Sequence, residues 1–265
     1  MQPMANMALR AARRASPILL QAMDRLDELK VEEKAPNDFV SSIDRQAERV
    51  IVDTLLDAYP DHGVLAEEGS GEERADAEFT WIIDPLDGTL NYLQGIPHFA
   101  ISIAARRGRQ IEHAVIVDPV RNEEWVASRG TGAQLNGKRI RVSATRRLGD
   151  AVIATGIPPG ARGRLGVFNA AVAEFTDSCR NIRRQGSAAL DLAYVASGRL
   201  DGFWEMGLAP WDIAAGSLIV KEAGGFVADL EGGERHFETG DIVVANPRCF
   251  KLMVACLRRH LATAA

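Results

Sequence analysis

The segment Trp81–Tyr92, WIIDPLDGTLNY, places two carboxylates directly behind an apolar run. Its first three residues have the side chains of a buried strand, and Asp84 and Asp87 follow with a proline stiffening the turn between them. Strands that end in acids place those acids at the rim of a sheet, where clefts form in α/β proteins. Two converging carboxylates repel each other unless a cation neutralises them. The segment is therefore either an ordinary Asp-Pro turn or a cation site at the edge of an α/β sheet.

Around this segment, the first half of the chain alternates helical and strand patterns. Apolar residues at helical spacing predict helices over residues 8–26 and 43–58, the second closed by Pro60. Runs rich in β-formers predict strands at residues 63–66, 81–84, 99–105, 113–118 and 124–128. Asn136-Gly137 predicts a type I′ turn within a hairpin over residues 134–142.

The second half begins near Asp150 and continues the alternation. Strands are predicted at residues 151–155, 201–206 and 241–247. Helices are predicted at residues 165–175, after Gly186-Ser187, from Pro210 to Gly224-Gly225, and at the C-terminus. We therefore expect two subdomains: residues 1–148, with an antiparallel sheet and the Asp84–Asp87 motif, and residues 149–265, an α/β unit.

The composition is that of an ordinary globular protein. Of the 265 residues, 46% are hydrophobic and 25% are charged, and the net charge of −5 gives no general attraction to nucleic acid or membrane. No run reaches the 18 uncharged apolar residues of a membrane span. The N-terminal region lacks acids before Asp24, as transit peptides do, but its helical spacing favours a helix of the mature fold. Three cysteines without C-x-x-C spacing favour buried or unreactive thiols in a reducing cytoplasm.

Arginine doublets recur along the chain. They are either solvated faces or a basic docking strip for a protein or RNA partner, and the sequence leaves both explanations open. The doublets are Arg13-Arg14, Arg106-Arg107, Arg146-Arg147, Arg183-Arg184 and Arg258-Arg259.

Further acids stand at the ends of predicted elements. Glu67 and Glu68 follow the strand at 63–66, and Asp212 lies in the first turn of the helix from Pro210. Each has an ordinary explanation, a solvated loop for the glutamates and an interaction with the helix dipole for Asp212. Three acidic places, each at the end of an element, instead favour a joint Mg²⁺ site, because hard oxygen ligands suit that ion together with a substrate phosphate.

The residues after Asp87 add a feature that suits phosphate. GTLNY has the pattern of a first helical turn, with Gly88 permitting close approach to its free amide groups. Metal ions and free amides on one phosphate are the arrangement expected for phosphoryl transfer.

Together, EEG at 67–69, WIIDPLDGTLNY at 81–92 and WDIAAGSLIVKEAGG at 211–225 resemble the inositol monophosphatase family of lithium-sensitive, Mg²⁺-dependent phosphatases. The resemblance runs over nearly the whole chain. NDFVSSIDRQAE and DLAYVASGRLDGFWEMGL are most similar to the bacterial inositol-1-monophosphatases of the extragenic-suppressor type. The resemblance implies an α/β fold of alternating layers, α-β-α-β-α, as in fructose-1,6-bisphosphatase. The first sheet is expected to be largely antiparallel, the second mixed, and the site to lie at their junction.

The resemblance also implies roles for individual residues. The implied metal ligands are Glu68, Asp84, Asp87, Asp212 and the backbone carbonyl of Leu86. Glu68 and Thr89 are expected to orient the attacking water, with Asp44 supporting the threonine. The residues expected to meet the substrate are Asp87, Gly88, Thr89, Gly186, Ser187, Ala188, Glu205 and Asp212.

The implied activity is hydrolysis of inositol 1-phosphate to inositol and phosphate, with two or three Mg²⁺ ions activating water and stabilising the leaving oxygen. Lithium sensitivity, a homodimer and a cytoplasmic location are implied as well. Two alternatives stay open. The chain could serve mainly as a partner of RNA polymerase and the antitermination or ribosome-assembly machinery, with catalysis secondary. It could also act on a related sugar or nucleotide phosphate.

The chain departs from the family pattern in places. Leu90 follows the motif threonine where a small or polar residue is usual, and it is expected to change the packing beneath the phosphate loop. The loop from Pro158 to Gly163 is shorter than in close relatives, so no substrate or partner contact is carried over to it from the family. Lys34 matches a basic residue near the metal site.

Overall fold

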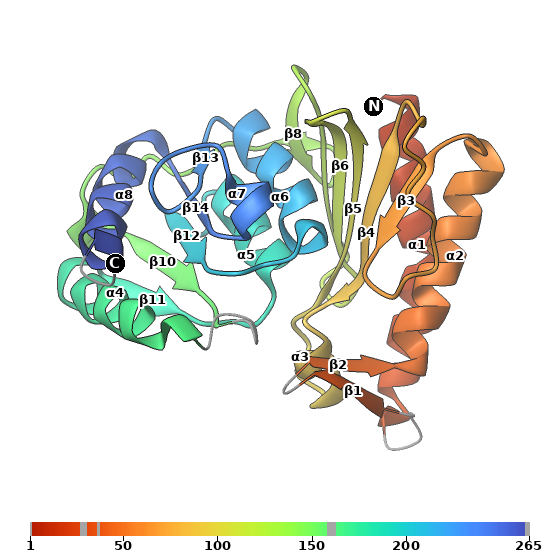
Figure 1. The fold of residues 1–265 in the computed structure, drawn as a ribbon, viewed down its shortest axis with the longest axis horizontal. Helices are drawn as coiled ribbons and strands as arrows, with labels where there is room; N and C mark the ends of the chain where they lie inside the picture. Colours follow the sequence, from red (N-terminus) through yellow and green to blue (C-terminus); the bar gives the residue numbers. More distant parts are fainter. Residues whose placement is uncertain (1, 27–30, 36–37, 158–162, 263–265) are drawn as a thin grey trace.

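The computed structural model describes residues 2–26, 31–35, 38–157 and 163–262, and it arranges them in five layers (Figure 1). A pair of helices is followed by a seven-stranded sheet, a second helix pair, a five-stranded sheet and a third helix pair. The predicted α/β fold with α-β-α-β-α layers is confirmed.

The first helix pair covers the outer face of the seven-stranded sheet. It consists of α1 (Pro3–Met23) and α2 (Ser42–Ala58). Helix α1 buries a face of small residues, including Ala8, Ala12 and Ala15, against the strands. Small side chains let a helix approach a sheet closely, so this segment is an integral layer of the fold, as its helical spacing predicts.

The seven-stranded sheet is largely antiparallel, as expected. Its strands are β3 (Gly63–Ala66), β4 (Thr80–Asp87), β5 (Ala100–Arg107), β6 (Gln110–Asp118), β7 (Glu123–Ser128), β8 (Gly132–Leu135) and β9 (Lys138–Arg139). They lie side by side in chain order, with only β3 and β4 parallel. Asn136 and Gly137 connect β8 to β9 with φ values of 49° and 75°, which confirms the predicted turn with two positive φ angles.

The five-stranded sheet is mixed. Its order is β11-β10-β12-β14-β13, with β10 parallel to β11 and β12 and with β14 antiparallel to both of its neighbours. The strands are β10 (Val152–Thr155), β11 (Asn181–Arg183), β12 (Gly202–Glu205), β13 (Phe226–Ala228) and β14 (Ile242–Ala245). Its outer face carries α4 (Leu165–Ser178) and α8 (Pro247–Ala262).

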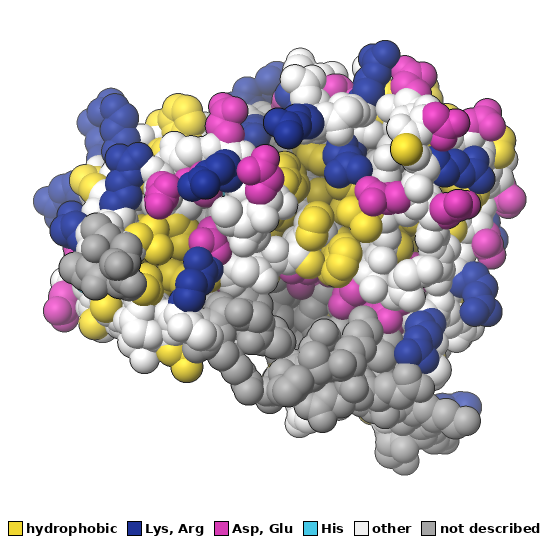
Figure 2. Space-filling view, in the orientation of Figure 1, with side chains coloured by type: hydrophobic (Ala, Val, Ile, Leu, Met, Phe, Trp, Pro, Cys, Tyr) yellow, Lys and Arg dark blue, Asp and Glu magenta, His cyan; other side chains and the backbone are white. Residues whose placement is uncertain are grey.

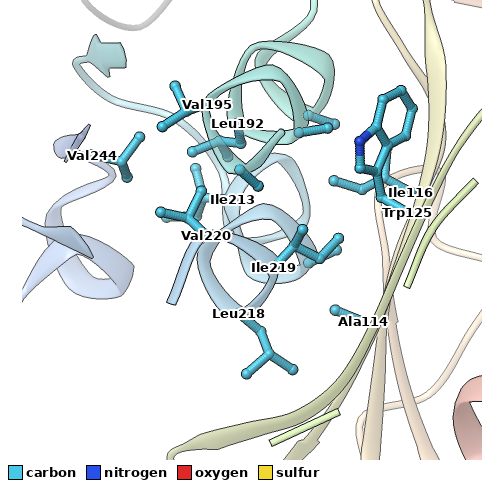
Figure 3. Close-up of a cluster of buried hydrophobic side chains, with 14 of the residues drawn as sticks. Ala114, Ile116, Trp125, Leu192, Val195, Ile213, Leu218, Ile219, Val220 and Val244 are labelled. Carbon is cyan, nitrogen blue, oxygen red and sulfur yellow. The ribbon is translucent and has the colours of Figure 1, made fainter. Parts of the chain in front are cut away.

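The middle helix pair holds the two sheets together. It consists of α5 (Ala188–Ala196) and α6 (Pro210–Glu222). Figure 3 shows Leu192 and Ile219 of these helices between Trp125 of the seven-stranded sheet and Val244 of the five-stranded sheet, in one buried cluster. Because this cluster includes residues from both sheets, it fixes the C-terminal end of β4 relative to the N-terminal end of α6. The division into residues 1–148 and 149–265 stays a prediction.

Several short elements escaped the sequence analysis. They are β1 (Val31–Ala35), β2 (Asp38–Ser41), a 3₁₀ turn η2 (Leu148–Asp150), β11, β13 and α7 (His236–Thr239). None is longer than five residues, too short to show a helical or strand period. Within the described ranges, no helix is both long and apolar enough to span a bilayer.

Strand β4 decides between the two explanations of the Asp84–Asp87 segment. The alternative of an ordinary turn is wrong, because β4 continues through Asp87. Asp84 pairs with Ser102 and Asp87 pairs with Ala100, so two residues of β4 lie opposite one residue of β5. This is a β-bulge, which shifts the alternation of side chains by one position. Residues three apart on a regular strand face opposite sides, but here Asp84 and Asp87 pair with residues two apart on β5 and therefore share a face.

Candidate metal centre

The bulge in β4 brings two acids to the N-terminal turn of α6. Carboxylate oxygens of Asp84, Asp87 and Asp212 all lie within 4.8 Å of one another. Asp212 sits in the first turn of α6, where one of its oxygens accepts a hydrogen bond from the Ala209 amide at 2.7 Å. Asp84 and Asp87 are buried and Asp212 is half-buried. The predicted meeting of these three acids is therefore present.

The electrostatics of this cluster favour a bound cation. Burial raises the pKa of Asp84 well above its usual range, and the neighbouring charges of Glu67, Asp87 and Asp212 raise it further. Burial also raises the pKa of Asp87 to about 6, against the opposing effect of hydrogen bonds from Ser187 and Ala189. Crowded, dehydrated carboxylates are costly without a counter-charge. An all-oxygen donor set of this kind fits Mg²⁺.

The fourth acid of the cluster is Glu67, the neighbour of the predicted ligand Glu68. The carboxylate that hydrogen-bonds to Asp84 is that of Glu67. The amide of Glu67 continues the β3–β4 ladder by donating to the Ile83 carbonyl at 3.1 Å. Along β3, Leu65 faces the cluster around α5 and α6, as Ile82 does on β4. Side chains alternate along a strand, so Glu67 and Asp84, each two residues further on, face the same side. Glu68 lies in the turn that follows β3.

A buried glutamate on α2 holds this loop. Glu48 is fully buried, and its two carboxylate oxygens accept hydrogen bonds from the amides of Glu68 and Ser70, both at 2.7 Å. A bidentate carboxylate on two backbone amides fixes the path of the chain immediately after Glu67. Sequence analysis missed Glu48, because nothing in its helical pattern marks it as a loop anchor.

The threonine after the bulge lies beside Asp44, as expected, and it also contacts Leu86. Thr89 Oγ1 is 3.4 Å from Asp44 Oδ1 and 3.0 Å from the Leu86 carbonyl oxygen. The Leu86 amide in turn donates to Asp84 Oδ1 at 2.9 Å. Asp44 is buried. This network fixes the Thr89 hydroxyl at the edge of the acidic cluster.

Gly88 begins a short helix, α3 (Thr89–Leu93), as predicted. Its φ of +97° favours glycine, and an added Cβ would meet the carbonyl oxygens of His98 and Gly186 at 3.1 and 3.2 Å. Asn91, which sequence analysis did not single out, donates to the carbonyls of His98 and Gln185, both at 2.8 Å. Asn91 therefore ties α3 to the segment that leads into α5.

The N-terminus of α5 closes on Asp87. The Ser187 hydroxyl and the Ala189 amide both donate to Asp87 Oδ2, the latter at 2.8 Å, and Ala188 contributes a further backbone hydrogen bond. Ser187 also caps α5 by accepting from the Leu190 amide. The predicted Gly186, Ser187 and Ala188 are thus next to Asp87, a hundred residues earlier in the chain.

Two more buried acids line this region. Glu205, at the end of β12, is buried, and its pKa is raised well above its usual range by burial and by the charges of Asp191, Asp212 and Asp87. A Cβ on Gly156 would lie 2.3 Å from the Glu205 carboxylate oxygens, so Gly156 leaves room for that group. Asp191, missed by sequence analysis, accepts from Gln185 at 2.6 Å, and burial raises its pKa to about 8.

The departures from the family pattern have different outcomes. Leu90 is 53% exposed, so the expected change of packing beneath the phosphate loop is wrong. Residues 158–162 of the shortened loop lie outside the described residues, and so does the side chain of Lys34.

Comparisons with known proteins agree with this geometry. Residues 1–262 match the model of the inositol monophosphatase family. The chain is 48% identical over 264 residues to a protein of Escherichia coli K12 named Nus factor SuhB, covering all of this chain and 99% of that one. It is similar to the crystal structure of the extragenic suppressor protein suhB from Bartonella henselae, with 44% identity, a TM-score of 0.91 and coverage of 95% and 97%. It is also similar to an inositol monophosphatase from Anabaena, with 32% identity, a TM-score of 0.86 and coverage of 96% and 95%.

Proposed function

Because this chain belongs to the inositol monophosphatase family, we propose that it is a Mg²⁺-dependent phosphomonoesterase. The observation that carries the proposal is the convergence of Asp84, Asp87 and Asp212, with Glu67 bonded to Asp84. A site that served only as a scaffold would not need four crowded carboxylates, since their mutual repulsion costs stability. Bound there, Mg²⁺ would polarise the phosphoryl group and lower the pKa of the attacking water.

The residues of the chain divide the remaining work. The amides at Gly88 and Thr89 would bind phosphate oxygens at the start of α3. The Thr89 hydroxyl, fixed by Asp44 and the Leu86 carbonyl, would orient the attacking water. The Glu67 carboxylate would accept a proton from that water once its hydrogen bond to Asp84 is opened. In this proposal Glu67 takes the role first expected of Glu68.

Inositol 1-phosphate is the proposed substrate, and Glu205 is the residue that would recognise it. Replacing Glu205 by Gln should lower kcat/KM for inositol 1-phosphate by about ten- to a hundred-fold, since a hydrogen bond to a charged acceptor is worth roughly 1.5–3 kcal/mol. Bound Mg²⁺ would favour the charged form of this carboxylate, against the effect of burial. p-Nitrophenyl phosphate has no ring hydroxyls and should be spared. Phosphate release from both esters, within a wider panel of sugar and nucleotide phosphates, measures this.

Two results would contradict parts of this proposal. Equal losses on both esters would place Glu205 in the metal site rather than against substrate hydroxyls. No phosphate release from any ester of the panel, with Mg²⁺ present, would contradict the proposed activity itself.

A second function is favoured by the names of the relatives rather than by the acids. At 48% identity, the E. coli relative is called a Nus factor. We propose that this chain likewise binds the transcription antitermination machinery, with RNA polymerase as a partner. Between the two functions, this finding favours the second as the main role.

The arginine doublets give this second function limited support. Arg13, Arg106, Arg107, Arg147 and Arg259 each form an ion pair with an acid of the chain. On the face shown in Figure 2, basic side chains are scattered among acidic ones. Arg183 and Arg184 are exposed and form no salt bridge with any of the described residues. That doublet is therefore the part of the proposed docking strip that is available to bind a partner.

A pull-down separates the two functions. The wild-type chain, Asp84→Asn and a double Arg183→Ala, Arg184→Ala variant would each be used to capture RNA polymerase from bacterial lysate, with and without RNase. Capture by wild type and Asp84→Asn but not by the arginine variant supports a partner role independent of catalysis. Absence of RNA polymerase from every sample contradicts the partner role.

The homodimer, lithium inhibition and a cytoplasmic location remain part of the proposal.

The two hydrogen bonds that Glu48 accepts from the loop after Glu67 lead to a prediction about metal affinity. Replacing Glu48 by Gln removes one of the two acceptors, so the Glu67 loop should be held less firmly. We expect the Mg²⁺ concentration for half-maximal activity to rise by about ten- to a hundred-fold, the usual cost of losing a group that orients a ligand. At saturating Mg²⁺, kcat should largely recover.

The control is Glu222→Gln on α6, which removes a comparable clamp, from Glu222 to the amides of Gly130 and Gly132. This variant should leave the Mg²⁺ dependence unchanged. If Glu48→Gln lowers the melting temperature and kcat without moving the Mg²⁺ dependence, its role is structural only.

A further inference from the structure

A second group of metal-ligating side chains lies on the far side of the five-stranded sheet. Helices α4 and α8 pack together there (Figure 1). Cys256 and His260 stand four residues apart on α8, which places them on one face of the helix, and Glu174 of α4 lies against that face. One ligand atom from each of the three residues lies within 4.8 Å of the others.

The contacts within this group converge on Glu174. His260 Nε2 is 2.6 Å from Glu174 Oε2, and Arg259 donates to the other oxygen, Oε1. The Cys256 thiol is also hydrogen-bonded to Glu174. Arg259 alone would balance the charge of the carboxylate in an ordinary ion pair. The imidazole and the thiol are additional, and both are ligands for a transition metal.

We propose that Cys256, His260 and Glu174 form a Zn²⁺ site between α4 and α8. Thiolate, imidazole and carboxylate are the three donors that Zn²⁺ takes in proteins, and three such ligands leave a fourth tetrahedral position for water. Zn²⁺ displaces the proton of the Cys256 thiol, and His260 binds through Nε2 as a neutral imidazole whose one hydrogen is on Nδ1. Arg259 keeps its contact with Oε1 and so orients the carboxylate. The different donor set and the position on another layer separate this site from the acidic cluster.

The burial of the three residues suits a bound ion. Cys256 is 1% exposed and forms the floor of the site. The side chains of His260 and Glu174 are 20% and 29% exposed, so an ion can reach the group from solvent. Without metal, burial raises the pKa of the Cys256 thiol to about 12. Binding therefore releases the thiol proton to solvent, because the thiolate is the ligand.

Cobalt titration of the full chain tests the site. Co²⁺ reports thiolate ligation through a near-ultraviolet charge-transfer band, and excess Mg²⁺ keeps the acidic cluster occupied without competing for a thiolate. We expect one equivalent of Co²⁺ to produce the band, Zn²⁺ to remove it, and each mole of metal to release the thiol proton. The band should be absent from Cys256→Ser and present in Cys249→Ser, the matched change at another buried cysteine of α8.

The partly exposed ligands provide the second measurement. His260→Gln and Glu174→Gln should each weaken Co²⁺ binding by about tenfold or more, and metal-free melting curves establish that the variants are folded. Three results would overturn the proposal: no charge-transfer band in the wild type, a band that persists in Cys256→Ser, or unchanged affinity in both His260→Gln and Glu174→Gln. Any of them would leave an ordinary ion pair between the helices. Phosphate release does not enter this test, so its outcome is separate from that of the proposed activity.

Discussion

Replacing Asp84 by Asn should lower phosphate release at saturating Mg²⁺ by about 100-fold or more, roughly 2.7 kcal/mol of transition-state stabilisation. Asp84 lies in the acidic cluster, where its carboxylate is within 4.8 Å of those of Asp87 and Asp212 and is hydrogen-bonded to Glu67. Removing its charge therefore weakens every metal position that the cluster provides. Initial rates with inositol 1-phosphate over a range of Mg²⁺ concentrations measure the loss.

Stability measurements serve as the control for this variant. Asn has nearly the shape of the protonated acid, so the metal-free variant should melt no lower than the metal-free wild type. Mg²⁺ should raise the melting temperature of the wild type, since it binds only the folded chain, and this rise should be lost in Asp84→Asn. Retention of more than about a tenth of the wild-type rate, against the large loss expected for a shared ligand, would contradict the metal role of Asp84.

Replacing Glu67 by Gln should also reduce the rate by about 100-fold or more, whereas Glu68→Gln should stay within a few-fold of wild type. The two variants differ by one position and by no other chemistry. Glu67 is bonded to Asp84, while the backbone amide of Glu68 is held by Glu48. The amide stays in place in Glu68→Gln, so the loop itself should not change.

Rates of both variants under identical Mg²⁺ concentrations decide between the two glutamates. A large loss in Glu68→Gln with a near-normal Glu67→Gln would restore the original prediction and refute the placement by strand alternation. Large losses in both would show that each carboxylate takes part. Melting temperatures with and without Mg²⁺ establish that a loss arises at the metal site rather than from unfolding.

The fold was largely predictable because its main elements are long enough to show a period. The helices near the N-terminus, the central strands and the Asn136-Gly137 turn were all found from local patterns. The spacing of apolar residues in a strand or helix shows which of its faces is buried. The alternation of such elements along the chain then indicates alternating layers. Short elements such as β11 and β13 were missed, because three residues carry no usable period.

The candidate site was predictable in its residue types but only in part in its geometry. Three acids at the ends of elements, with a following Gly-Thr, indicated a metal and phosphate site before any contact was known. The pair Glu67-Glu68 could have been resolved by counting two residues on from Leu65, had the facing side of that strand been known. That side is set by packing against α5 and α6, which the local sequence does not contain.

By itself, the sequence determined the element types, the acids and the family to which the chain belongs. Only the tertiary structure decided that the β4 bulge turns Asp84 and Asp87 to one face, that Glu48 holds the loop after Glu67, and that Cys256 and His260 meet Glu174. The physical reason is that local periodicity depends on near neighbours along the chain. Register, bulges and contacts between helices depend instead on the packing of segments that lie far apart in sequence.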